Sequence, residues 1–212
     1  MNTCGLLVRM HARHDKEHAV EELLRSALPL IVDEPQTSAW FALRFGRGEY
    51  GIFDVFPDDA ARDAHLSGRV RAILDKRSGE LFERAPRIEK VDVLADKLPV
   101  ASSVPDTRGL LLTFRVKPGH EAEMEDFIHF ANEAVNEERT TTAWFGIRMR
   151  EGEYGIFDVF PGNEERFLHL VGHVPRELAK QAFAFLGAMP EIEMLSVQAE
   201  KIGQDAHQIA RH

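Results

Sequence analysis

The sequence predicts an α+β protein made of two ferredoxin-like βαββαβ repeats that pack sheet to sheet within one chain. Three observations predict this fold class. The chain repeats itself at a fixed offset, each copy has the element order strand, helix, strand, strand, helix, strand, and one strand of each copy is apolar on both faces. The 212 residues, 44% of them hydrophobic, are enough to fill the core of one or two ordinary globular domains.

The second half of the chain is a copy of the first, displaced by 104 positions. The segment Glu49–Pro57 recurs unchanged as Glu153–Pro161. Aligned without a gap, about 35 of the 94 residue pairs are identical, roughly six times the number expected by chance. A segment rich in Pro and Ser separates the copies and has no apolar periodicity, as a linker would. We therefore predict repeat 1 at residues 1–98, a linker at 99–107, repeat 2 at 108–202 and a polar tail at 203–212.

The elements of repeat 1 follow from hydrophobic spacing and turn residues. A short apolar run predicts the strand 6–10, and 3.6-residue spacing of apolar positions predicts a helix over 16–30. A glycine-containing turn joins strands 39–45 and 50–56 into a hairpin. After Pro57 a helical stretch runs to Leu66, and Gly68 separates it from a second one that ends near Glu83. Strand 88–94 completes the repeat, and strand 110–116, helix 120–135 and strand 192–197 are the counterparts in repeat 2.

The strand 50–56 carries large apolar side chains on both of its faces. Tyr50, Ile52 and Phe56 point to one side, and Phe53 and Val55 point to the other. A strand that is apolar on both sides is buried on both sides. We therefore expect helices on one face of each sheet and the other repeat on the opposite face, with the covalent connection favouring the association.

Composition excludes several classes of function. The 26 basic residues are scattered among 35 acidic ones, giving a net charge of −9, which is unfavourable for a general nucleic-acid binder. No apolar stretch approaches the roughly 18 residues of a membrane helix, and no secretory signal is visible. The single cysteine, Cys4, cannot form an internal disulfide. We expect a cytoplasmic protein with no nucleic-acid or membrane partner.

Four segments of repeat 1 resemble the antibiotic biosynthesis monooxygenase family. They are Thr37–Arg44, Tyr50–Pro57, Ala61–Gly68 and Pro86–Leu98, and repeat 2 carries the same signature. The resemblance implies the dimeric α+β barrel fold, in which two ferredoxin-like units join their sheets. It also implies oxidation of a small aromatic phenol or quinol by O₂ without a bound cofactor. Because the two units are fused here, the family's homodimer becomes an internal pseudo-dimer, and further homo-oligomerisation stays open.

Such chemistry requires a base that takes the substrate's proton and a donor that stabilises the resulting anion. His65 and His169 are the only histidines present in both repeats, and they are the candidate bases. The alternative is a helix-end histidine that bonds a neighbouring carbonyl group. Arg44 and Arg148 are the candidate anion stabilisers. Trp40 and Trp144, at one strand position in both copies, are candidate aromatic walls for the substrate, or simple core residues.

Residue alternation places further candidates beside these. Trp40 and Arg44 share one strand face, and Tyr50 and Asp54 share a face of the next strand, so one hairpin register brings all four together. The same holds for their counterparts in repeat 2. A carboxylate amid apolar residues needs a partner, and Arg44 and Arg148 are the expected ones. Besides the histidines, arginines and tryptophans, the predicted substrate-binding residues are Tyr50, Tyr154, Asp54 and Asp158.

Metal chemistry is not expected. His169 and His173 have the four-residue spacing of two ligands on a helix, but Gly172 and Pro175 argue against a regular helix there. Two functions other than oxygenation stay open. One is a non-catalytic module that binds a small ligand or serves assembly, and the other is heme binding with degradation, which some relatives of the resembled family perform.

Overall fold

The computed structural model describes residues 2–99, 107–172, 176, 180 and 184–203. In this part of the chain, helices and strands alternate in the predicted order, and no helix is long and apolar enough to cross a membrane. The elements of the first copy are β1 (Cys4–His11), α1 (Glu17–Val32), β2 (Ala39–Gly46), β3 (Glu49–Phe56), α2 (Asp59–Leu66), α3 (Arg69–Leu81) and β4 (Arg87–Lys97). Those of the second are β5 (Arg108–Arg115), α4 (Glu121–Glu137), β6 (Ala143–Arg150), β7 (Glu153–Phe160), α5 (Asn163–Leu170) and β8 (Glu191–Ile202).

Turn chemistry places these elements where the sequence predicts them. The β2–β3 and β6–β7 hairpins turn at Gly48 and Gly152, which have φ values of 73° and 70°, a backbone region that favours glycine. Asp58 begins α2, and its side chain accepts a hydrogen bond from the Ala61 backbone. Gly68 stands between α2 and α3, as expected.

The strands are hydrogen-bonded in the order β1-β3-β2-β8-β5-β7-β6-β4, which closes on itself. This is the strand order of a dimeric α+β barrel formed within one chain, and it confirms the predicted fold class. The chain divides into two compact units, which are described separately below.

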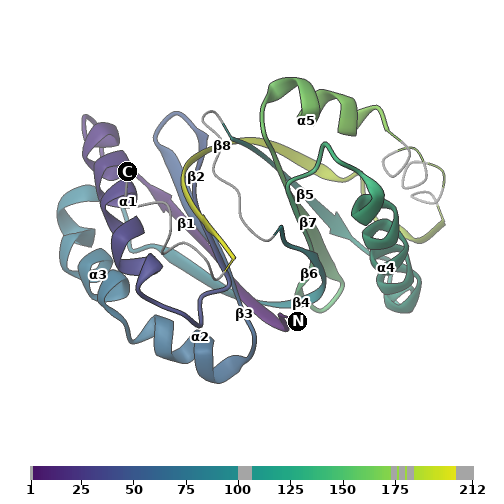
Figure 1. Ribbon diagram of the computed structural model, residues 1–212, viewed down its shortest axis with the longest axis horizontal. Helices are drawn as coiled ribbons and strands as arrows, with labels where there is room; N and C mark the ends of the chain where they lie inside the picture. Colours follow the sequence, from purple (N-terminus) through teal and green to yellow (C-terminus); the bar gives the residue numbers. More distant parts are fainter. Residues whose placement is uncertain (1, 100–106, 173–175, 177–179, 181–183, 204–212) are drawn as a thin grey trace. The chain divides into compact units, whose positions relative to one another are not determined.

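Among the described residues, unit 1 contains repeat 1 up to Lys90 and the segment Ser196–Gly203. Its strands β1, β3 and β2 pair antiparallel, and the last part of β8 adds to β2, where Ile202 faces Ala39. Helices α1 and α3 cover one face of this sheet (Figure 1). The buried side of α1 consists of Val20, Leu23, Leu24, Ala27 and Ile31.

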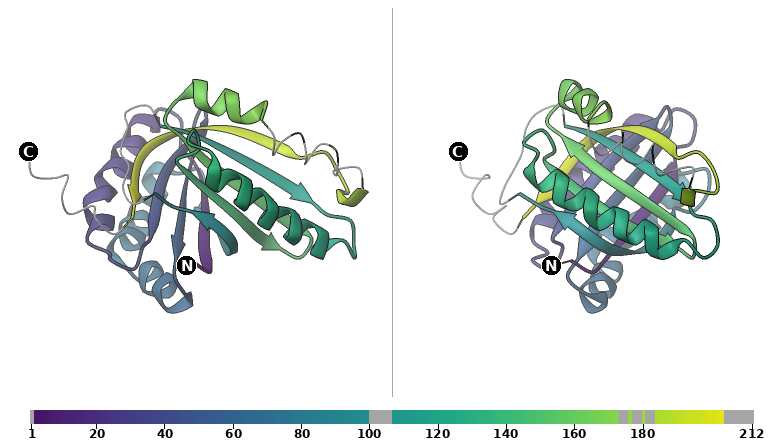
Figure 2. Two further views of the ribbon diagram at one scale, coloured as in Figure 1. Left: turned by 45° about the vertical axis from the view of Figure 1, so that its right-hand side comes forward. Right: turned by 90° about the vertical axis from the view of Figure 1, so that its right-hand side faces the viewer.

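Unit 2 has the same construction from repeat 2, and it includes Val91–Pro99 from the end of repeat 1. Here β5, β7 and β6 pair antiparallel, and the last part of β4 adds to β6, where Lys97 faces Trp144. Helix α4 lies across one face of this sheet (Figure 2). Its buried side chains are Met124, Phe127, Ile128, Ala131 and Val135.

The two final strands are longer than predicted because each contributes to both units. The sequence predicts strands over 88–94 and 192–197, whereas β4 extends to Lys97 and β8 to Ile202. The additional residues pair with a strand of the other repeat. Local apolar spacing carries no information on such long-range pairing, so only the first part of each strand was visible in the sequence.

The strand predicted to be buried on both faces is so in both units. Tyr50, Phe53 and Phe56 of β3 are fully buried, and Phe157 and Phe160 of β7 are at most 1% exposed. The tyrosine and the final phenylalanine lie in the core under the helices, whereas Phe53 and Phe157 lie on the opposite strand face.

Candidate functional site

The candidate residues of repeat 1 share one face of the β2–β3 hairpin. Trp40 lies directly across from Asp54, and Arg44 lies directly across from Tyr50. In repeat 2, Trp144 faces Asp158 and Arg148 faces Tyr154. The register therefore brings together the four residue types that alternation placed on one surface. This surface is the one covered by the helices.

A histidine cluster occupies one end of this surface in unit 1. Helix α2 carries His65 over β3, where its Nδ1 lies 2.6 Å from Glu34 Oε2 and its Nε2 lies 3.2 Å from Asp54 Oδ2. The imidazole also packs against the Phe56 ring, with 5.1 Å between centroids. Thr37 donates a hydrogen bond of 3.0 Å to Glu34 Oε2. Both ring nitrogens of His65 therefore face carboxylates, and the side chain is only 8% exposed.

Repeat 2 has the same cluster in a looser form. The Nδ1 atom of His169 lies 3.0 Å from Glu138 Oε2, and its Nε2 lies 3.6 Å from Asp158 Oδ1. Thr141 donates to Glu138 over 3.0 Å. The ring of Phe160 lies 5.2 Å from the imidazole, as Phe56 does in repeat 1.

Burial and charge act in opposite directions on the two histidines. Burial alone would lower the pKa of His65, but hydrogen bonds and charges of Asp54 and Glu34 raise it to about 10. The pKa of His169 is raised for the same reasons by Glu138 and Asp158. Burial raises the pKa of Asp54 and raises that of Asp158 to about 7, against the opposing effect of the histidines. The His65–Asp54 pair therefore retains a proton at neutral pH.

A lysine from the other repeat's last strand completes each cluster. Lys201 is buried and donates through Nζ to the backbone oxygens of Ile31 (3.0 Å) and Glu34 (2.5 Å) at the end of α1. Lys97 donates to Val135 and Glu138 in the same manner at the end of α4. These oxygens lie at the carboxyl end of a helix, where carbonyls lack the regular helical donor, and those of Ile31 and Val135 also accept the backbone N–H of Glu34 and Glu138. The lysine charge also lies where the helix dipole favours a cation.

The predicted ion pairs between the arginines and the buried aspartates are wrong. Arg44 lies 3.3 Å from Glu21 of α1, and Tyr50 donates to the same carboxylate over 3.0 Å. Arg44 stands four residues from Trp40, the strand partner of Asp54, which is about 13 Å along a strand. The arginine is therefore at the half-exposed end of the hairpin, and His65 reaches Asp54 instead.

The corresponding cluster of repeat 2 is more heavily charged. Arg148 bonds Asp92 over 2.8 Å and Glu125 over 3.0 Å, and Tyr154 donates to Glu125 over 3.1 Å. These residues line an open pocket of about 380 Å³ in unit 2. In repeat 1 the strand partner of Arg44 is Ser196, so Arg44 lacks the additional carboxylate that holds Arg148.

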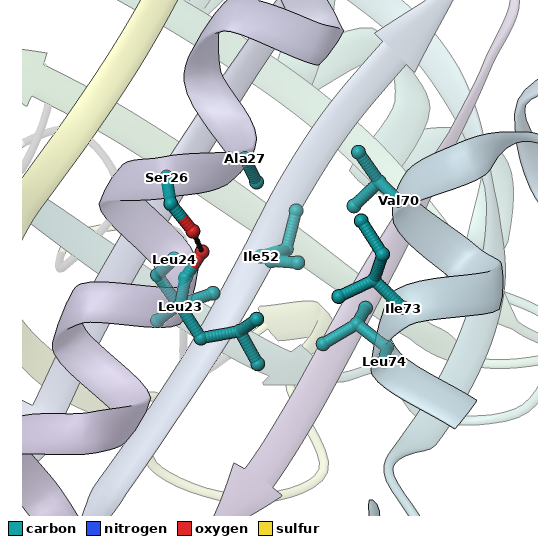
Figure 3. A pocket seen from close by; sticks show the side chains of 8 residues that line it. All are labelled: Leu23, Leu24, Ser26, Ala27, Ile52, Val70, Ile73 and Leu74. Carbon is teal, nitrogen blue, oxygen red and sulfur yellow. Dashed lines mark hydrogen bonds between the residues drawn. The ribbon is translucent and has the colours of Figure 1, made fainter. Parts of the chain in front are cut away.

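A small apolar cavity lies between α1 and α3 in unit 1, over Ile52 of β3 (Figure 3). Its volume is about 20 Å³, enough for about one water molecule. The one polar group in its wall, the Ser26 hydroxyl, donates to the Leu23 backbone oxygen over 2.8 Å. Ile52 lies between Tyr50 and Asp54 on the same strand face, so each polar cluster begins about 7 Å from the cavity floor.

Comparisons with known proteins agree with this architecture. No protein-family model matches the sequence, and no curated protein sequence matches it. A Fusobacterium nucleatum structure described as a "putative monooxygenase" has a TM-score of 0.85 and 16% identity, over 95% of this chain and 94% of that chain. A Listeria monocytogenes ferredoxin-fold protein related to antibiotic biosynthesis monooxygenases has a TM-score of 0.54 and 6% identity, over 93% and 95%.

This chain has the fold of a tandem-repeat dimeric α+β barrel. A third similar structure, an anthrone oxidase-like protein, has a TM-score of 0.59 and 13% identity, over 94% of this chain and 92% of that chain. At these identities the likeness establishes the fold of the tandem barrel. The chemistry must be argued from its own residues.

In the tandem barrel both tryptophans are fully buried in the core. The Nε1 atoms of Trp40 and Trp144 have no hydrogen-bond partner among the described residues. A substrate therefore does not reach the indole faces in this arrangement, and the role of the tryptophans as substrate walls stays a prediction. His173, the second histidine of the metal-ligand spacing considered above, lies outside the described residues. Within the described ranges, no group of three or more His, Cys, Asp or Glu side chains is arranged to hold a metal ion.

Sequence reasoning missed the glutamates and threonines of the two clusters and the role of the lysines. Glu34 and Glu138 are separated by the same 104 positions as the histidines that they contact, and so are Lys97 and Lys201. Identity at the repeat offset was the available signal. It marked these residues, but it did not say which of them meet.

Proposed function

We propose that the chain is a monooxygenase that oxidises a small aromatic quinol with O₂ and no bound cofactor, at the helix-covered face of repeat 1. The observation that carries the proposal is the apolar cavity over Ile52, which has a polar cluster at each end. Arg44, Tyr50 and Glu21 form one cluster, and Asp54 and His65 belong to the other. A quinol has oxygens at both ends of an apolar ring, and therefore suits this arrangement better than a phenol with one oxygen.

The fold neighbours support this reaction class. One is described as a "putative monooxygenase" and another as anthrone oxidase-like. In the proposed reaction the quinol loses a proton, and the anion transfers an electron to O₂. The oxygen then bonds to a ring carbon, the O–O bond breaks, and one water leaves. The balance is quinol plus O₂ giving hydroxyquinone plus water, with no external reductant. A water-poor site favours this sequence because charges interact more strongly there.

The residue roles follow from the two clusters. Asp54 and His65 act as one proton-accepting unit, since both nitrogens of the imidazole already face carboxylates and the buried Asp54 is the group with a raised carboxyl pKa. Arg44 stabilises the anion at the opposite end. Trp40 supports the wall from the core. His169, Asp158, Arg148, Tyr154 and Trp144 are the corresponding residues of repeat 2, and we propose their roles only for a substrate that reaches them past Phe130.

The size of the cavity adds a requirement. At about 20 Å³ it has no space for an aromatic ring, so the quinol enters only when α1 and α3 move apart. Repeat 2 carries Phe130 at the position of Ser26. A phenylalanine at this point of the wall obstructs the cavity of repeat 1, and Ser26→Phe therefore tests the location directly.

The experiment is oxygen uptake by the purified protein with a panel of hydroquinones and dihydroxyanthracenes. We expect uptake that falls at least 100-fold in the double variant His65→Ala/His169→Ala, in line with removal of a positioned base. Ser26→Phe should lose most of the uptake contributed by repeat 1, while the exposed Ser67→Ala change should leave it unaltered. Melting curves confirm that each variant is folded. Uptake equal in the wild type and the histidine double variant would overturn the proposal.

A second candidate is a non-catalytic module that binds a small apolar ligand. The observation that favours it is the engagement of both ring nitrogens by carboxylates in each repeat, which is also how a purely structural histidine is held. This candidate predicts saturable quinol binding, measured by calorimetry, with no oxygen consumed.

We place the protein in the reducing cytoplasm, which its single buried cysteine supports.

A further inference from the structure

The surface of repeat 2 has an apolar patch on α5 and β8. Of the exposed large hydrophobic side chains in the described part of the chain, every one belongs to repeat 2. Five of them form what we call the α5–β8 patch, and all are 45–65% exposed: Phe167, Leu168, Val171, Ile192 and Met194. Met189, 78% exposed, precedes β8. The α5 members follow the spacing of one helix side, and the two β8 members lie on one strand face.

Repeat 1 provides an internal comparison for this patch. At the offset of 104, Phe167 and Met194 correspond to Asp63 and Lys90. These two form an exposed ion pair of 3.1 Å between α2 and β4. Leu168 and Val171 correspond to Ala64 and Ser67. The fold therefore accommodates polar residues at three of the five positions, while Ala64 and Ile88 occupy the other two. The apolar side chains of Phe167, Val171 and Met194 are thus not required by the fold.

The patch is large for the surface of a monomer. Taking about 200 Å² of accessible surface for each large side chain, its five members and Met189 together expose about 700 Å². That slightly exceeds the roughly 300–600 Å² of the largest apolar patch on a typical monomer. It is also most of the roughly 800 Å² that each partner contributes to a standard protein–protein interface.

We propose that the α5–β8 patch binds the same patch of a second copy of this chain, forming a dimer of tandem barrels. An apolar surface is complementary to itself, and a patch that meets its own copy about a two-fold axis gives a closed dimer instead of an open filament. Repeat 1 carries the polar counterpart, so a second apolar face of this kind does not extend the assembly. The proposal does not depend on the proposed oxygenase activity.

The test measures oligomeric state by sedimentation velocity and light scattering over a broad range of concentrations. The wild type is expected to sediment as a dimer of the 24.0 kDa chain at high concentration. The variant Phe167→Asp/Met194→Lys introduces the ion pair of repeat 1 and should raise the dimer Kd at least about thirtyfold, the effect of losing an interface hot spot. Because the side chains are exposed, its melting temperature should stay close to that of the wild type.

Two further variants complete the test. Asp63→Ala/Lys90→Ala alters the matching positions of repeat 1 and should leave the dimer Kd unchanged. Asp63→Phe/Lys90→Met gives repeat 1 an apolar pair and should produce assemblies larger than a dimer. A wild type that is monomeric at every concentration would overturn the proposal, and so would a dimer that survives Phe167→Asp/Met194→Lys. If the protein stays monomeric and binds lipid vesicles, the patch contacts a membrane surface and the proposed dimer is wrong.

Discussion

The carboxylate of Glu34 lies 2.6 Å from Nδ1 of His65, although 31 residues separate them in the sequence. The other ring nitrogen of His65 lies 3.2 Å from the fully buried Asp54. One imidazole therefore connects the segment after α1, helix α2 and strand β3. Because an unpaired carboxylate in the core is unfavourable, Asp54 depends on this histidine for its counter-charge.

The histidine cluster makes the stability of the protein depend on pH. The pKa of His65 is about 10 in the folded state against 6.5 for an unperturbed histidine, so the folded state retains a proton that the unfolded state has released between these values. The resulting stabilisation is complete below pH 6.5 and is lost as the pH rises through 10. One proton corresponds to a slope of about 1.4 kcal/mol per pH unit.

The double variant His65→Gln/Asp54→Asn removes both titrating groups of the pair. Between pH 7 and pH 10, the free energy of unfolding measured with urea should therefore fall less steeply with pH in this variant than in the wild type. The two slopes should differ by about 1.4 kcal/mol per pH unit. His18→Gln, at a side chain that is 81% exposed, is the matched control and should keep the slope of the wild type. Equal slopes in the double variant and the wild type would contradict the proton assignment.

The lysine at the end of each exchanged strand should contribute strongly to stability. Lys201→Met removes the charged donor of the backbone oxygens of Ile31 and Glu34 at a buried position, and each oxygen keeps only a backbone N–H donor. We expect a loss of about 2–3 kcal/mol in the free energy of unfolding, as for a hydrogen bond from a charged group. Lys97→Met should have a similar effect through Val135 and Glu138.

Lys76→Met, on the exposed side of α3, is the control for both lysine variants and should change stability by less than about 0.5 kcal/mol. The three variants are compared by urea denaturation. If Lys201→Met is no more destabilising than Lys76→Met, the lysine does not act as a helix cap.

Two glycines should respond in opposite directions to the same substitution. A Cβ atom added to Gly51 would overlap the Val8 backbone oxygen and come within 2.7 Å of the Phe45 ring. Gly51→Ala is therefore expected to destabilise the protein by about 1–3 kcal/mol through overpacking. At Gly79, inside α3, nothing lies within 4 Å of the added atom. Gly79→Ala should stabilise by about 0.5–1 kcal/mol, since alanine favours a helix over glycine. Thermal melts of both variants check the two signs.

The sequence predicted those features that depend on local spacing or on the repeat. Residue alternation placed Trp40, Arg44, Tyr50 and Asp54 on one face, and the hairpin register confirms it. The predicted partner of Asp54 was wrong because residue alternation describes one strand and does not say which side chain of a covering helix reaches that strand. Arg44 was the charged residue nearest in the pattern, whereas His65 arrives from α2.

The strand exchange could not be predicted for a similar reason. The last residues of β4 and β8 pair with strands of the other repeat, and nothing in their own sequence marks this. The exchange is reflected in the sequence by a lysine at the same position of both repeats, Lys97 and Lys201. Their helix-end acceptors are about 40 and 170 residues away in the chain, beyond any local pattern.

The chain contains only two tyrosines, one in each repeat, so their ionisation can be followed without interference. Burial and the neighbouring carboxylate of Glu21 raise the pKa of Tyr50 to about 12, and Glu125 has the same effect on Tyr154. Glu21→Gln removes one of the two charges. It should shift half of the tyrosinate absorbance to lower pH and leave the other half in place, while Glu21→Gln/Glu125→Gln shifts all of it. Circular dichroism at each pH confirms that the fold persists, because unfolding alone would release both tyrosines. An absorbance titration that is identical in wild type and Glu21→Gln would contradict the contact between Tyr50 and Glu21.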